Sequence, residues 1–122
     1  MLLIARILPG TLLSEMLAVA GELGLETLVE VHDGADLERV LRLPAPLVGI
    51  NARDLGTFRV DLDAAAELAS RTPRDRVAVL ESGISGPADV SALVQRGFRQ
   101  FLVGEYLVRS GDPRATLAEL LA

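Results

Sequence analysis

Five short apolar runs, separated by segments in which apolar residues recur with helical spacing, constrain the fold of this chain more than any other feature. The runs show no regular alternation with polar residues, which is typical of strands that are covered on both faces. They span Leu2–Leu8, Thr27–Val31, Leu47–Ile50, Val77–Leu80 and Phe101–Val103. Strands that alternate with helices favour a parallel sheet with right-handed crossovers. We therefore predict five strand–helix pairs within a single α/β domain over residues 1–122.

The segments between the runs also carry signals for helix ends. Asp at a helix start can cap free backbone N–H groups, proline fits the first turn, and glycine often follows the last turn. We expect N-caps at Asp33 or Asp36, Asp61 and Asp112, first-turn prolines at Pro87 and Pro113, and closing glycines at Gly24 and Gly97.

The number of strands bears on the architecture. A doubly wound sheet and part of a (β/α)8 barrel both fit the alternation, and a complete barrel takes about 200–250 residues. With 122 residues and five strands, a barrel-like chain would form roughly half of a barrel. Its exposed sheet edges would be an aggregation hazard. We expect a second copy, the missing half of the barrel or a departure from barrel geometry to cover them.

Composition excludes several classes of function. The net charge of −5 argues against non-specific nucleic-acid binding. The chain has no cysteine and no metal-type spacing of histidines, so we expect no metal site. All 12 basic residues are arginine, which rules out lysine chemistry within the chain. The opening "MLLIARILPGTLL" matches neither a signal peptide nor a membrane span. We expect a cytoplasmic protein with no membrane partner.

Polar residues stand at the carboxyl ends of the predicted strands, where parallel α/β folds place their functional groups. Glu30, between two valines, could transfer protons or form a salt bridge with an arginine. Asn51 could bind a substrate hydroxyl or cap a turn. Arg53 could hold a carboxylate or pair with Asp54 or Glu30. His32 is expected to be a loop residue.

Two glycine-containing turns follow the last two strands. They are Ser82–Ser85 ("SGIS") and Val103–Glu105 ("VGE"). Glycine lets backbone N–H groups approach an anion, and (β/α)8 enzymes commonly bind phosphate after their last two strands. The alternative is that these glycines only form tight turns.

Together, "LLIARIL", "LGLETLVEVHD", "LVGINARDLGTFRVDL", "ESGIS" and "FLVGEYLV" resemble the second half of indole-3-glycerol phosphate synthase, strands four to eight of its barrel. The resemblance covers Leu2 to about Leu121. It implies a lyase of tryptophan biosynthesis that needs no cofactor or metal. That enzyme closes the indole ring of 1-(2-carboxyphenylamino)-1-deoxyribulose 5-phosphate, with loss of carbon dioxide and water.

The resemblance also implies roles for individual residues. Glu30 matches the proton-transferring glutamate and Asn51 the substrate-holding asparagine. The other matches are Ser82 and Arg53 for substrate, Leu2, Ile4 and Leu55 for the apolar wall around the aromatic ring, and Gly83, Gly104 and Glu105 for phosphate. Some relatives have serine at the position of Glu105.

One departure from the family affects the expected activity. The family's lysines and its first-strand glutamate have no counterpart here, and one of those lysines is the general acid of ring closure. We therefore expect the isolated chain to be inactive or impaired. The alternatives are a non-catalytic, phosphate-binding half-barrel that associates with itself, and a phosphate-binding barrel enzyme such as an isomerase of histidine biosynthesis.

Overall fold

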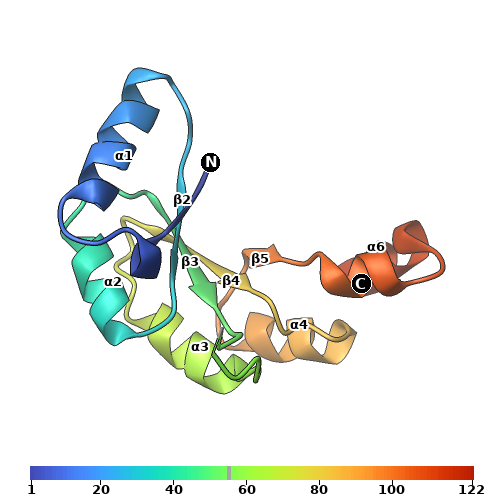
Figure 1. Cartoon of the computed structure of the whole chain (residues 1–122). Helices are drawn as coiled ribbons and strands as arrows, with labels where there is room; N and C mark the ends of the chain where they lie inside the picture. The colour runs from blue at the N-terminus through green and yellow to red at the C-terminus, as the bar shows by residue number, and fades with distance from the viewer. Residues whose placement is uncertain (55) are drawn as a thin grey trace.

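One parallel sheet organises the chain, as the computed structural model of residues 1–54 and 56–122 shows. The strand order is β1-β2-β3-β4-β5, so each strand pairs with the next one in sequence (Figure 1). The strands are β1 (Leu2–Ile4), β2 (Leu28–Val31), β3 (Leu47–Asn51), β4 (Val77–Glu81) and β5 (Phe101–Leu102). The helices are η1 (Ala5–Ile7, a 3-10 turn), α1 (Leu12–Glu22), α2 (Gly34–Leu41), α3 (Leu62–Ser70), α4 (Pro87–Gln95), α5 (Glu105–Arg109) and α6 (Pro113–Leu121). The predicted partial (β/α)8 barrel is confirmed.

Side chains and backbone set the helix ends as the sequence predicts. The Asp33 carboxylate accepts a hydrogen bond from the Asp36 N–H at 2.9 Å, so Asp33 is the cap of α2. Asp61 caps α3 and Asp112 caps α6 in the same way. The remaining predicted signals are also confirmed: Pro87 and Pro113 lie in first turns, and Gly24 and Gly97 follow α1 and α4 with φ of 67° and 99°.

Two predicted elements differ from the structure. The first strand ends at Ile4 and not at Leu8, because pairing with β2 stops at the Ile4–Glu30 position and the chain turns into η1. Arg6 then donates a hydrogen bond to the Asp33 carboxylate at 3.0 Å. The last strand is followed by two helices, since Asp112 caps a second one after the short α5.

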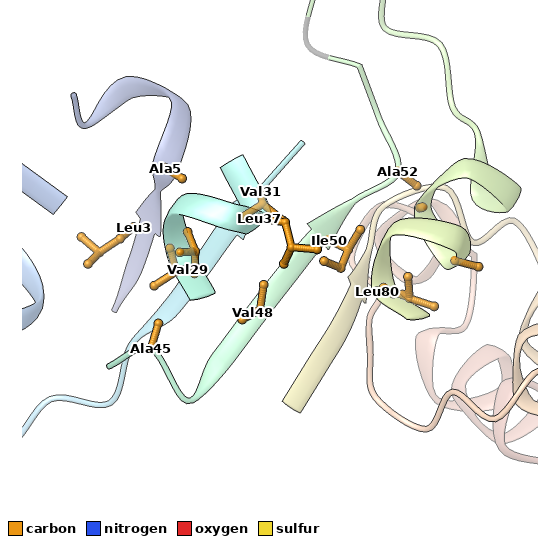
Figure 2. Packing of buried hydrophobic residues seen from close by; sticks show 14 of the residues in the cluster. Leu3, Ala5, Val29, Val31, Leu37, Ala45, Val48, Ile50, Ala52 and Leu80 are labelled. Carbon is orange, nitrogen blue, oxygen red and sulfur yellow. The ribbon is translucent and has the colours of Figure 1, made fainter. Parts of the chain in front are cut away.

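The hydrophobic core lies between the sheet and one layer of helices. Strand residues that point to this side are almost completely buried, as Figure 2 shows for Val29, Val48, Ile50 and Leu80. Leu37 of α2 packs in the same cluster. The sheet is therefore held in shape from its helical side.

The opposite face of the sheet is different, and we call it the open face. Side chains alternate along a strand, so residues paired in register point to the same side. Its first row is Leu2, Leu28, Leu47 and Val77, its second is Ile4, Glu30, Gly49 and Val79, and its third is Asn51, Glu81 and Leu102. Figure 1 shows α1 to α4 in an arc on the other side of the sheet. The open face is apolar at the amino ends of the strands and polar at their carboxyl ends.

Candidate functional site

Three polar side chains meet at the carboxyl ends of β2, β3 and β4. Asn51 and Glu81 are register partners, and Glu30 lies on the same face. The Asn51 side-chain amide donates a hydrogen bond to Glu30 Oε1 at 3.0 Å. Its oxygen accepts one from the Arg53 N–H at 2.9 Å, which fixes the orientation of the amide. The structure thus brings the predicted Glu30 and Asn51 together and adds Glu81.

Glu30 and Glu81 form a buried pair of carboxyl groups, with 5% and 4% of each residue exposed. Burial raises the pKa of Glu81, and the hydrogen bond to Glu30 and the charge of Glu30 raise it further, to about 8. A carboxyl group with this pKa is protonated at neutral pH. The pair therefore places a proton donor beside a proton acceptor.

Gly49 makes room for this pair. A Cβ at this position would overlap the Glu81 carboxylate, although Gly49 lies inside a strand, where glycine is otherwise unfavourable. Among the described residues, no arginine lies within ion-pair distance of Glu30, so the predicted alternative of a structural salt bridge is wrong.

His32 belongs to the same cluster. Its Nε2 lies 3.0 Å from Glu30 Oε1, and its Nδ1 lies 4.0 Å from an Asp36 oxygen. Only 3% of its side chain is exposed. The residue follows β2 as expected for a loop, but its side chain is directed inward to Glu30.

A cavity of about 520 Å³ lies at the ends of β4 and β5. Neither Glu30 nor Glu81 is among its lining residues, but Ser82, the residue after Glu81, is. Among its lining residues are five of the predicted site residues: Arg53, Ser82, Gly83, Gly104 and Glu105. Ser82 and Gly83 have φ of 62° and 82°, so the chain turns sharply after β4. A Cβ at Gly83 would overlap Val60, so this position requires glycine for both reasons.

Two arginines share one carboxylate at the wall of this cavity. Arg53 donates to Glu105 Oε2 at 2.7 Å, and Arg109 lies 3.1 Å from Glu105 Oε1. The predicted ion pair of Arg53 with Asp54 or Glu30 is therefore replaced by one with Glu105. Both guanidinium groups line the cavity, and Glu105 partly neutralises them.

Comparison with known proteins decides the family. The family model for indole-3-glycerol phosphate synthase matches residues 1–120. The chain belongs to this family. An indole-3-glycerol phosphate synthase of Acidovorax sp. (strain JS42) is 51% identical over 121 residues, and one of Paracidovorax citrulli (strain AAC00-1) is 50% identical over 121 residues. Each match covers 99% of this chain but only 46% of the relative, so the chain spans about half the length of these synthases.

Solved structures support the fold alone. The Amycolatopsis orientalis BexX/CysO complex matches with a TM-score of 0.58 and 24% identity, over 88% of this chain and 48% of that chain. Mandelate oxidase with benzoyl-formic acid matches with a TM-score of 0.62 and 15% identity, over 84% of this chain and 35% of that chain. In both cases a larger α/β chain contains a unit like this synthase-family chain.

Of the remaining site residues predicted from the synthase family, two lie on the open face and one lies outside the described residues. Ile4 is half-buried beside Glu30 in the register, and Leu2, two residues earlier on the same strand, is 51% exposed. Both could contribute to an apolar wall. Leu55 lies outside the described residues, so its predicted role is untested.

Glu81, His32 and Arg109 were not among the sequence predictions for this synthase-family site. The signal for Glu81 was present, because the open-face positions Val77 and Val79 continue with a period of two to residue 81. His32 gives no such signal, since it lies beyond the end of β2. Arg109 becomes part of the site only because α5 is a separate short helix.

No helix within residues 1–54 and 56–122 combines the length and apolar character needed to cross a bilayer. In the same part of the chain, no group of three metal-ligating side chains is arranged to hold an ion.

Proposed function

We propose that this chain supplies one half of an indole-3-glycerol phosphate synthase site. The reaction would be ring closure of 1-(2-carboxyphenylamino)-1-deoxyribulose 5-phosphate, with loss of carbon dioxide and water. The observation that carries the proposal is the buried Glu30–Glu81 pair, which hydrogen bonds through Asn51 and Arg53 connect to the cavity lined by Arg53 and Ser82 to Ser85. The family match supports the choice of reaction.

The carboxyl pair fits the proton transfers of this reaction. Loss of carbon dioxide restores the aromatic six-membered ring without release of a proton. Loss of water then requires a proton for the departing hydroxyl and releases a proton from the carbon beside the nitrogen. Glu81 has a pKa of about 8 and is therefore protonated at neutral pH, so it can give the first proton. Glu30, held by Asn51, can accept the second. Two carboxyl groups in different environments can thus divide acid and base roles.

The cavity fits the phosphate of the substrate. Ser82, Gly83 and Gly104 line the cavity, and Arg53 and Arg109 bring positive charge to it. Backbone N–H groups and arginines together are a common phosphate-binding combination. The half-exposed Ile4 and Leu2 would then face the aromatic part of the substrate.

The isolated chain should turn over substrate at background rate, because it has no lysine to act as the general acid. We expect indole-product fluorescence to rise when the purified chain is mixed with the separately produced part of the Acidovorax relative that it does not match. In that mixture, Glu30→Gln should lower the rate about 10²–10⁴-fold.

Glu67→Gln is the matched control, since Glu67 is an exposed carboxylate on α3 and should leave the rate unchanged. Full activity of the Glu30→Gln mixture would contradict the proposal. Phosphate binding without any turnover in the mixture would instead favour the non-catalytic alternative.

Glu105 should compete with phosphate for the two arginines. Replacing it by Gln removes a negative charge from the cavity wall, so we expect inorganic phosphate to bind about three- to tenfold more tightly, as measured by calorimetry. Glu119→Gln on α6 makes the same change of net charge on an exposed surface and should have little effect. Weaker phosphate binding by Glu105→Gln would show that the carboxylate helps to position the arginines for the ligand, and unchanged binding would show that it does not compete with phosphate.

A further inference from the structure

We propose that His32 is a positioning residue that keeps Glu30 ionised and thereby places the shared proton of the carboxyl pair on Glu81. The two members of the pair are chemically identical side chains, so their surroundings must decide which one is the acid. This role of His32 rests on the proposed function only for its effect on turnover, because the position of the proton can be measured in the isolated chain.

Two polar side chains converge on one oxygen of Glu30. The Asn51 amide donates a hydrogen bond to Glu30 Oε1 at 3.0 Å. His32 Nε2 lies 3.0 Å from the same oxygen. Hydrogen bonds donated to a carboxylate stabilise its ionised form. Because both groups lie at Oε1, Oε2 is the Glu30 oxygen that remains to exchange a proton with Glu81 or with substrate.

Glu81 has no comparable partners. Among the described residues, no hydrogen bond reaches its buried Oε1. Burial raises the pKa of Glu81, and the hydrogen bond to Glu30 and the charge of Glu30 raise it further. A buried carboxyl group that receives no such donors favours its neutral form. The pair is therefore asymmetric, with the donors at Glu30 and the proton at Glu81.

The surroundings of His32 favour donation from Nε2. The side chain is 3% exposed, and neither ring nitrogen has an aligned hydrogen bond to another described residue. A buried N–H without an acceptor is costly, and Glu30 Oε1 lies at hydrogen-bonding distance from Nε2. Nδ1 lies 4.0 Å from Asp36 Oδ2, which is too far for a direct hydrogen bond. We therefore expect the imidazole to carry a proton on Nε2, directed to Glu30.

His32 is separate from the candidate phosphate cavity. His32 and Asn51 line a second cavity of about 230 Å³, whereas neither of them lines the cavity of about 520 Å³. Loss of the imidazole should therefore change Glu30 without removing a contact to the substrate phosphate. The charged residues that share the second cavity with His32 are Arg53, Asp54, Arg59 and Asp61.

The protonation of the ring nitrogens can be measured directly, because the chain contains a single histidine. Nitrogen NMR of the unsubstituted chain with isotope-labelled histidine distinguishes a protonated Nε2 from a bare one. We expect a proton on Nε2 at neutral pH. A bare Nε2, with the proton on Nδ1 alone, would overturn the proposal, since His32 could not then donate to Glu30.

The side-chain carboxyl carbons of Glu30 and Glu81 report where the shared proton lies. Carbon NMR at neutral pH should show Glu30 ionised and Glu81 protonated, with the signals assigned from Glu30→Gln and Glu81→Gln. His32→Leu removes the donor, so the two signals should move towards each other. His32→Gln offers an amide N–H near the position of Nε2 and should keep them apart. Unchanged signals in His32→Leu, with the variant folded by circular dichroism, would also overturn the proposal.

Turnover separates this role from a direct contact with substrate. In the mixture with the unmatched part of the Acidovorax relative, His32→Leu should lower kcat about 10- to 100-fold, the size expected for one lost hydrogen bond to a charged group. KM should change little, and His32→Gln should recover most of the rate. A higher KM at unchanged kcat would contradict the positioning role. If the unsubstituted mixture shows no turnover, the proposed reaction is wrong, and the two NMR measurements still decide the place of the proton.

Discussion

The folded state of this chain should lose stability as the pH rises from about 5 towards 8, with a slope approaching about 1.4 kcal/mol per pH unit. The cause is Glu81, whose pKa is raised from 4.5 in an ordinary setting to about 8 by burial and by Glu30. Between these two values the folded chain holds a proton that the unfolded chain has released. Each further unit of pH therefore favours unfolding. The free energy of unfolding from urea titrations at several pH values measures this slope.

Glu81→Gln is the control, because a neutral amide of similar shape cannot release the proton. The difference between the pH profiles of the two proteins isolates the contribution of the Glu30–Glu81 pair, because all other groups are the same in both. The variant should be the more stable protein near pH 8, and the difference should shrink towards pH 5. Parallel pH profiles for both proteins would show that the carboxyl pair is not linked to folding.

Ile50→Ala should be the most damaging single truncation in the core, lowering the free energy of unfolding by about 2–5 kcal/mol. Ile50 is fully buried on the helical side of β3, the central strand of the sheet, close to Leu37 (Figure 2). Neighbouring strands and helices prevent the site from collapsing around the lost methyl groups. Urea unfolding monitored by circular dichroism measures the loss.

Ile50→Val provides a graded control, because it removes a single methylene group and should lower the free energy of unfolding by about 0.5–1.5 kcal/mol. A similar loss of unfolding free energy for both variants would mean that the loss does not depend on the side-chain volume removed from the core. No loss for Ile50→Ala would place the main core elsewhere.

The sequence predicted the elements because local and long-range signals agreed. Apolar runs such as Leu47–Ile50 became strands, and side chains such as Asp61 provided the caps. The end of β1 could not be predicted in this way. The apolar run continues to Leu8, but pairing ends where β2 ends, and pairing depends on a strand more than twenty residues away.

The site could be predicted only in part for a related reason. Glu30, Asn51 and Arg53 are recognisable from their position after strands, but their contacts depend on the register of neighbouring strands. The register places Glu81 against Asn51, and the turn after β5 brings Glu105 to Arg53. The sequence pattern identified the edge of the sheet that carries the site, and the tertiary fold decided which side chains share a proton or a charge.

The space beside Gly49 has a consequence for how this site can change by mutation. Since a Cβ at this position would overlap the Glu81 carboxylate, the two positions cannot vary independently. A library that randomises position 49 alone should return glycine, whereas alanine should become acceptable once residue 81 carries a shorter side chain. A substitution at residue 81 must therefore precede one at position 49, because the Glu81 side chain occupies the space that a Cβ at position 49 would need.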